Sequence, residues 1–177
     1  VLRLTTETAD GQVFTDSSTM WVNPPRTLMV GTNGEAVRFV HPIATTQEIL
    51  ELGQGQPRRL ESESEFDNYG NPTRSINYGI VEGTNRSAFN DERATTTEYA
   101  INTNAWIIRL PKRQEVADEN DVVISRSESF YDDEAFAGNN FGVVTIGNLT
   151  LQRAWVFNDT ATTEIYTART KYDSYGN

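Results

Sequence analysis

The chain has 177 residues, a net charge of −10, 37% hydrophobic residues and no cysteine. These values are typical of one thinly cored domain, and they exclude disulfides and thiolate metal sites. An acidic surface repels phosphates, so neither nucleic acid nor an anionic membrane is an expected partner. No apolar run is long enough to span a bilayer.

Alternating and β-branched stretches, separated by turn-forming clusters, predict an all-β fold built as an antiparallel β-hairpin meander. The turn clusters include Thr32-Asn33-Gly34, Gly138-Asn139-Asn140 and Asn158-Asp159-Thr160. The predicted strands are Val1–Glu7, Ala36–Val40, Arg59–Phe66, residues 73–80, Ala94–Ile101, Trp106–Leu110, Val122–Tyr131, Leu149–Phe157 and Glu164–Tyr172.

One stretch competes with this pattern. Thr45-Thr46-Gln47-Glu48 fits a capping box, and Gly53 is suited to end a helix. We therefore expect at most one short helix, near residues 46–52, whose formation depends on packing. The following segment Leu52–Pro57 predicts an internal boundary, with an N-terminal β segment over 1–57 and a repeat-like hairpin segment over 58–177.

The strongest hairpin signal spans residues 59–80. Glu61, Glu63 and Glu65 fall on one face of the first strand, which we interpret as a solvated face that discourages edge aggregation. A face for a basic partner is the alternative. In the second strand, one face is predicted to hold Arg74, Ile76, Tyr78 and Ile80.

The turn of this hairpin belongs to a repeated motif. Phe66-Asp67-Asn68-Tyr69-Gly70-Asn71 recurs as Tyr172-Asp173-Ser174-Tyr175-Gly176-Asn177, and Tyr131-Asp132-Asp133 is a degenerate copy. The aromatic residue ends a strand, Asp accepts backbone N–H groups, and Gly and Asn tolerate left-handed backbone. The motif is therefore predicted to be a turn between neighbouring strands, and coincidence is the alternative.

The order of motifs resembles the YD repeat of RHS proteins, and more closely the B component of bacterial insecticidal toxin complexes and related plasmid-virulence proteins. The resemblance covers Arg59–Asn177 well and Val1–Pro57 loosely. The stretches that carry it are Trp106-Ile107-Ile108-Arg109-Leu110-Pro111, Asp118–Asp121, Phe130-Tyr131-Asp132, Gly138–Gly142, Gly147-Asn148-Leu149-Thr150 and Tyr172–Asn177.

This resemblance implies a non-enzymatic segment of a secreted, extracellular β-shell that encloses a toxin polypeptide. Its partners would be the neighbouring repeats of a parent protein and the enclosed polypeptide. The chain is too short to close a cavity, and it lacks the Asp-Pro-x-Gly ending at which such shells cleave themselves. Because the sequence begins at Val1 without a signal peptide, we expect an excised fragment. Its C-terminal edge is predicted to fray or to self-associate with a second copy.

Candidate chemical sites are weak. His41 is the only histidine and lacks the partners of a catalytic base, so a role at a strand end is expected. Solvated turns are the preferred interpretation of two acidic clusters, although calcium binding or a glycosidase carboxylate pair is the alternative. The clusters are Asp118, Glu119 and Asp121, and Asp132, Asp133 and Glu134. No catalytic, cofactor or metal residue is predicted.

The alternative function is a carbohydrate- or cell-surface-binding β module. Its binding platform would consist of exposed aromatic side chains, whereas aromatic residues at strand spacing more often pack in a core. The candidates are Trp21, Trp106, Trp155, Tyr69, Tyr78, Tyr99 and Tyr166. Three glycosylation sequons, at Asn85, Asn148 and Asn158, matter only in a glycosylating secretory pathway.

Overall fold

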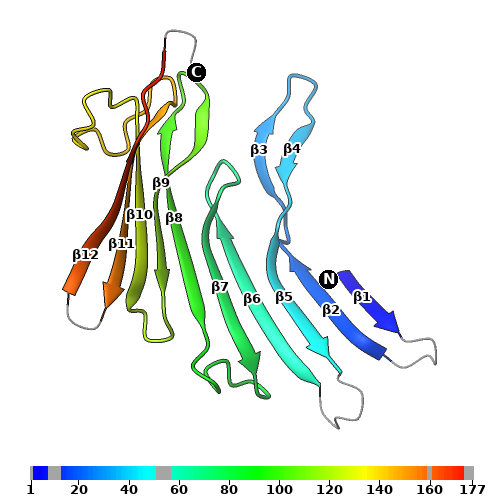
Figure 1. Cartoon of the computed structure of the whole chain (residues 1–177). Helices are drawn as coiled ribbons and strands as arrows, with labels where there is room; N and C mark the ends of the chain where they lie inside the picture. The colour runs from blue at the N-terminus through cyan, green and yellow to red at the C-terminus, as the bar shows by residue number, and fades with distance from the viewer. Residues whose placement is uncertain (1, 8–12, 51–56, 159–160, 174–177) are drawn as a thin grey trace. The chain divides into compact units, whose positions relative to one another are not determined.

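The computed structural model describes residues 2–7, 13–50, 57–158 and 161–173. These residues form strands and no helix, and the strands pair antiparallel, as the sequence predicts. The chain forms two compact units, residues 1–94 and residues 95–177, which are drawn in Figure 1 and described separately below. The described residues include no helix that could span a membrane.

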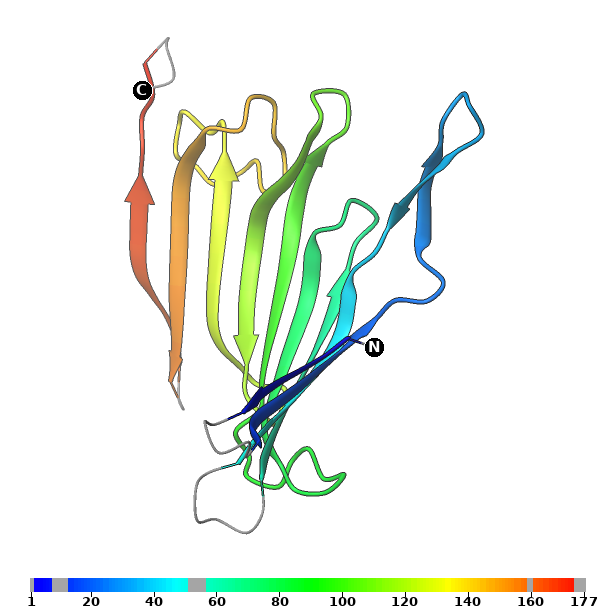
Figure 2. The ribbon, with the colours of Figure 1, turned by 90° about the vertical axis from the view of Figure 1, so that its right-hand side faces the viewer.

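The first unit holds a sheet in which strand order follows chain order, with one insertion. Its strands are β1 (Leu2–Glu7), β2 (Val13–Trp21), β5 (Pro42–Ile49), β6 (Arg58–Phe66) and β7 (Pro72–Val81). Between β2 and β5 the chain leaves this sheet and forms a separate two-stranded ribbon, β3 (Arg26–Val30) and β4 (Ala36–Phe39). Figures 1 and 2 both show the ribbon extending beyond the ends of β2 and β5.

The second unit is a meander of five strands: β8 (Arg93–Asn102), β9 (Ile107–Ala117), β10 (Val123–Tyr131), β11 (Leu149–Asn158) and β12 (Ala161–Arg169). The first two residues of β8 still belong to the first unit. Short turns join most of these strands. The exception is the connection between β10 and β11, a loop over residues 132–148.

The short helix allowed near residues 46–52 does not form over the described part, because residues 42–49 are strand β5. Strand β5 pairs with β2 on one side and β6 on the other, so its backbone groups are satisfied in two ladders. A single helical turn is marginal in water, and Thr45 and Thr46 favour the pleated surface. The sheet therefore overrides the capping-box pattern.

The boundary predicted at Leu52–Pro57 falls on a segment of which the structure describes only Pro57. Strands β5 and β6, on either side of it, are neighbours in one sheet. The division between residues 1–57 and 58–177 therefore stays a prediction.

Strand β7 does not keep the single face predicted for Arg74, Ile76, Tyr78 and Ile80. Its register against β6 shifts, so Ile80 lies opposite Leu60 while Asn77 lies opposite Ser62. Because Leu60 and Ser62 share one face of β6, Ile80 joins the face of Asn77 instead of that of Ile76.

Gly79 permits this bulge. Its φ is +60°, and the carboxylate of Asp91 occupies the space in which a Cβ would lie, 2.2 Å away. Asp91 also accepts a hydrogen bond from the backbone N–H of Ile80 at 3.1 Å. A side chain at position 79 would therefore be both strained and obstructed.

The hydrophobic core is small and unevenly distributed. In the second unit Ala100, Tyr131 and Val144 form a buried cluster, against which Ile107, Leu110 and Leu149 pack. Among the described residues of the first unit, Val81 is the only buried hydrophobic residue. The first unit is therefore a sheet without a conventional packed core.

Candidate functional site

The turn at Asp67 joins β6 to β7 and is closed by one carboxylate. Oδ1 of Asp67 accepts the backbone N–H groups of Tyr69 at 2.8 Å and Asn71 at 2.9 Å, and its Oδ2 accepts the side-chain amide of Asn71 at 2.8 Å. The backbone N–H of Asp67 donates to the carbonyl of Asn71 at 2.9 Å. Gly70 adopts a φ of +85°, and Asn71 is fully buried. Each residue of the motif thus has a distinct local role.

The same turn is attached to the base of the β3–β4 ribbon. Arg26 donates to the side-chain oxygen of Asn68 at 2.8 Å and to the backbone carbonyl of Asp67 at 2.6 Å. The guanidinium of Arg26 also lies 5.5 Å from the ring centre of Phe39. The ribbon base is therefore fixed by charge-assisted hydrogen bonds.

His41 lies in an aromatic cluster at this base. Its ring centre is 4.7 Å from that of Phe39 and 4.4 Å from that of Phe66. Its Nδ1 is 3.2 Å from the carbonyl of Pro42. These contacts place the histidine at the start of β5 in a packing role, in accord with its expected position at a strand end.

The acidic stretch at Asp118 forms a second turn with the geometry of the first. Oδ1 of Asp118 accepts the N–H groups of Asn120 and Val122, both at 2.9 Å. Its own N–H donates to the carbonyl of Val122 at 3.0 Å, and the N–H of Asp121 returns to the carbonyl of Asp118 at 3.1 Å. Asp121, with a φ of +59°, occupies the place that Gly70 holds in the first turn. The motif search missed this copy because Asp118 alone retains the pattern.

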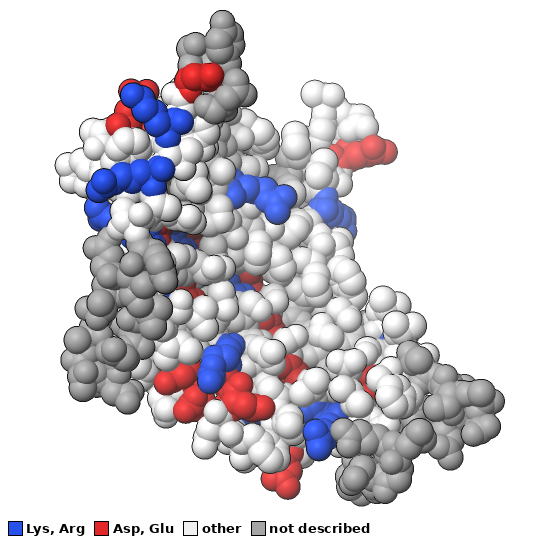
Figure 3. All heavy atoms as spheres, in the orientation of Figure 1, with Lys and Arg blue, Asp and Glu red and all other residues white. Residues whose placement is uncertain are grey.

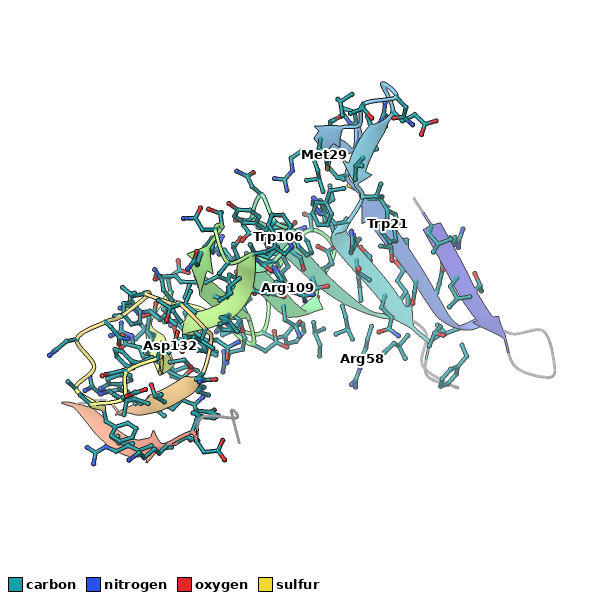
Figure 4. The ribbon with its side chains drawn as sticks, turned by 90° about the horizontal axis from the view of Figure 1, so that it is seen from above. Trp21, Met29, Arg58, Trp106, Arg109 and Asp132 are labelled. Carbon is teal, nitrogen blue, oxygen red and sulfur yellow. The ribbon has the colours of Figure 1, made fainter. Side chains whose placement is uncertain are left out.

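Asp132, in the degenerate copy, uses its carboxylate differently. It accepts the backbone N–H groups of Thr145 at 2.7 Å, Ile146 at 2.9 Å, Gly147 at 3.1 Å and Asn148 at 2.9 Å. The carboxylate therefore fills a concave nest of backbone donors, and Figure 4 shows Asp132 inside the 132–148 loop. Burial raises the pKa of Asp132, but these backbone hydrogen bonds outweigh burial and lower the pKa to about 2.

The residues flanking Asp132 hold the loop against the core. The hydroxyl of Tyr131 donates to the carbonyl of Pro111 at 2.7 Å, and burial raises the pKa of this phenol. The side-chain amide of Asn140 donates to the carbonyl of Tyr131 at 2.6 Å. Asp133 accepts the N–H of Gly138 at 2.6 Å. The second acidic cluster is thus largely occupied with its own loop.

The C-terminal copy of the motif is only partly described. Tyr172 is half-buried, and its hydroxyl donates to the carbonyl of Leu149 at 3.2 Å, while Asp173 is exposed. Tyr175, Gly176 and Asn177 lie outside the described residues. The turn predicted there stays a prediction.

The three predicted glutamates of β6 face an open groove of about 520 Å³. Glu61 is 8% exposed and is paired with Arg59 and, at 2.7 Å, with Arg86. Arg86 also contacts Glu63 at 2.7 Å. Arginine thus neutralises Glu61 and Glu63 within the unit. The prediction of a solvated glutamate face is wrong for Glu61, which is buried in an ion-pair network.

The opposite face of the same sheet carries hydroxyl and amide groups. Ser62 lies between Thr45 of β5 and Asn77 of β7, and Ser64 lies opposite Ser75. The first unit therefore presents an ion-paired face and a face on which hydroxyl and amide groups lie beside Leu60 and Ile80. Over the described residues, no second layer of strands covers either face.

Strand β10 repeats this division in the second unit. Arg126 donates to Glu115 at 2.6 Å, and Glu128 accepts from Arg113 at 2.9 Å. Ser125, Ser127 and Ser129 alternate with them along the strand. In the view of Figure 3, Lys and Arg residues lie interspersed with Asp and Glu, and large areas are uncharged.

The acidic clusters do not assemble into a metal site over the described residues. No group of three or more His, Cys, Asp or Glu side chains there is arranged to hold a metal ion. Oδ1 of Asp118 and both carboxylate oxygens of Asp132 accept backbone N–H groups instead of pointing together at a shared cation position.

The predicted aromatic platform is scattered over the described residues. Trp106 is 73% exposed in the turn between β8 and β9, whereas Trp155, Tyr78 and Tyr99 are half-buried. The Tyr78 hydroxyl donates to Glu63 at 2.9 Å, and burial together with this bond raises its pKa. Trp21 and Tyr69 are moderately exposed, at 39% and 38%. The side chain of Tyr166 lies outside the described residues.

Comparison with known proteins yields likeness of fold only. No protein-family model matches the sequence, and no curated protein matches it. A crystal structure of a TcdB2–TccC3–Cdc42 assembly aligns over 90% of this chain with a TM-score of 0.62 and 11% identity. A Tc holotoxin pore of Photorhabdus luminescens aligns over 90% with a TM-score of 0.56 and 11% identity. The fold is thus similar to a portion of toxin-complex proteins, and the chain spans 10% of the length of each matched chain.

Proposed function

We propose that this chain is a non-enzymatic wall segment of an RHS/YD-repeat β-shell, which encloses a toxin polypeptide in a secreted toxin complex. The observation that carries the proposal is the sheet of the first unit, where both faces carry polar side chains and Val81 is the only buried hydrophobic residue among those described. A sheet that packs on a core has one apolar face. A wall between two aqueous compartments needs none, so its faces have the composition seen here.

The carboxylate-closed turns support a scaffold role. The carboxylates of Asp67 and Asp118 each fix a turn between antiparallel neighbouring strands, and that of Asp132 fixes a loop that reaches the core. Such turns set the register of the next strand. Carboxylate oxygens that already accept two or more backbone N–H groups are poorly placed to bind substrate or transfer protons.

The fold likeness supports the wider context of the proposal. The matched chains belong to toxin-complex assemblies, and each is about ten times the length of this chain, judged by the 10% that is covered. By analogy of fold, the partners of this segment are adjoining strands of a longer polypeptide and the enclosed chain, and its location is extracellular.

Protease protection of the complete gene product tests the proposal. In intact product, proteinase K should leave an internal polypeptide uncut, and the same polypeptide should be degraded after the sheet is opened in denaturant. A polypeptide cut at equal rates before and after opening, or a complete product that contains nothing beyond these two units, would overturn the enclosing role.

One observation favours a carbohydrate- or cell-surface-binding module as the second candidate. Trp106 is 73% exposed and has a φ of +53°, so the β8–β9 turn presents a large aromatic face to solvent. Protein-bound sugars commonly stack on such faces. Glycan binding that is lost in Trp106→Ala, with an unchanged unfolding midpoint, would favour this module over the wall.

A further inference from the structure

The β3–β4 ribbon carries apolar side chains that nothing in the unit covers. Leu28, Met29 and Val30 of β3 are 46%, 61% and 62% exposed, and Val37 of β4 is 49% exposed. In Figure 4 the labelled Met29 lies on the ribbon, away from the strands of the sheet. Among the described residues, ten of the seventeen exposed large hydrophobic side chains lie in the segment 2–40, and the ribbon and its ends account for five of them.

The ribbon also has two open edges, because β3 and β4 pair only with each other. A two-stranded ribbon is marginally stable alone, and its outer backbone groups are a template for a further strand. The tie of Arg26 to Asn68 and Asp67 holds the ribbon base in a fixed position. The ribbon is therefore already held in position before any partner binds.

The edge of β3 is the unguarded one. Its residues Thr27–Val30 are all exposed and contain no charge, proline or glycine. By contrast, β4 carries the exposed Arg38, and the edge strand β1 carries Arg3, which is paired with Asp16. Charges on an edge strand oppose pairing with another chain, so β3 is the edge at which a strand would add.

We propose that β3 is a self-docking edge, at which two copies of this chain pair β3 against β3 about a two-fold axis. The result is a four-stranded antiparallel sheet with the order β4-β3-β3-β4. A second copy supplies the partner that the edge needs: an antiparallel, uncharged strand with exposed Leu28, Met29 and Val30. A two-fold pairing is closed and stops at the dimer. Residues 26–39 contain Arg26, Arg38 and Glu35, so the ribbon has a net charge of about +1 within a chain of −10, and repulsion at the paired edge itself is small.

This inference is independent of the shell proposal, because a dimer of the isolated chain neither requires nor excludes an enclosed polypeptide. It also places self-association at an edge other than the C-terminal one that the sequence suggests.

Sedimentation equilibrium over a concentration series tests the proposal with the intact chain. The parent chain should show a monomer–dimer equilibrium, and Met29→Lys should raise the dimer dissociation constant at least about tenfold. Val143→Lys, at a side chain that is 57% exposed in the second unit, is the matched control and should leave the constant unchanged. A parent chain that stays monomeric throughout, or two lysine variants that behave alike, would overturn the proposal.

Single-cysteine variants keep the test decisive if a lysine variant folds poorly, which circular dichroism would reveal. The chain has no cysteine, so Leu28→Cys, Met29→Cys and Val30→Cys each introduce one thiol. At least one should form a disulfide-linked dimer much faster than Val143→Cys under mild oxidation, because thiols near the axis face each other. Equal rates at all four positions would contradict β3 pairing.

Discussion

Arg26 at the start of β3 donates a hydrogen bond of 2.8 Å to the side chain of Asn68 in the β6–β7 turn. The two residues are 42 positions apart in sequence, and the same guanidinium reaches the carbonyl of Asp67. The turn motif therefore does more than connect two strands, because it also receives the base of the inserted ribbon. This contact links the β6–β7 hairpin, the clearest hairpin in the sequence, to the inserted β3–β4 ribbon.

Removing this tie should destabilise the first unit. Arg26→Met keeps the length of the side chain but loses both charge-assisted hydrogen bonds, so we expect a loss of about 1–3 kcal/mol in the free energy of unfolding. Arg38→Met, on the exposed side of the same ribbon, should change it by less than about 0.5 kcal/mol. Urea denaturation of the two variants measures the difference, and equal effects would show that the tie has no energetic role.

Alanine variants at Gly70 and Gly34 should distinguish the cost of backbone strain from the cost of a steric clash. Gly70 and Gly34 have φ values of +85° and +82°, but a Cβ on Gly70 would lie 3.0 Å from the Phe39 ring, whereas nothing lies within 4 Å at Gly34. Gly34→Ala should therefore cost about 1 kcal/mol from strain alone. Gly70→Ala should cost about 1–3 kcal/mol more, because the ring must move. Matching unfolding midpoints would mean that Phe39 gives way freely.

The hydrogen bonds to Asp132 should make the free energy of unfolding depend on pH in the acidic range. The pKa of Asp132 in the folded protein, about 2, lies below the ordinary value of 3.8 for an aspartate. The stabilisation is therefore complete above about pH 5 and is lost as pH falls through 2. It amounts to about 2 kcal/mol.

Asp132→Asn should remove this contribution. The variant should be less stable than the parent at pH 6 and should approach it near pH 2, so the two stability curves converge in acid. Denaturant unfolding between pH 2 and 6 measures this. Curves that run parallel over the whole range would rule out the nest as the source.

The two similar turns should respond alike to loss of their carboxylates. Asp67→Ala and Asp118→Ala each remove two backbone N–H bonds to one oxygen, so we expect each to cost about 1.5–3 kcal/mol. Glu134→Ala, at an exposed acid of the 132–148 loop, provides the control for lost charge. An Asp118→Ala variant with an unchanged free energy of unfolding would mean that the two turns, although alike in geometry, do not contribute equally to stability.

The regular parts of the fold could be predicted from sequence because their signals are local. The hairpin of β6 and β7 combines alternation with a turn whose Asp67, Gly70 and Asn71 all act within five residues. By contrast, β2 and β5 escaped prediction because their middle residues, 15–19 and 45–48, are polar on both faces, so apolar alternation is weak. The bulge at Gly79 depends on Asp91, which lies twelve residues away in sequence.

For the candidate site, the sequence indicates some of the turn residues but not their partners. The sequence predicts Asp67 and Asp132 as turn residues, and in the structure both accept backbone N–H groups. The donors of Asp132 lie 13 to 16 residues downstream, and no local pattern indicates them. The tie from Arg26 to Asn68 is equally invisible in sequence, because it depends on where the sheet places the ribbon.

A cryo-electron microscopy structure of the complete gene product tests the central claim most directly. We expect β1 to β12 to form part of a larger sheet that bounds a lumen, with density for a polypeptide facing one of the two polar faces. A compact protein in which an added layer covers either face of the first unit with an apolar core, and in which no lumen exists, would contradict the account.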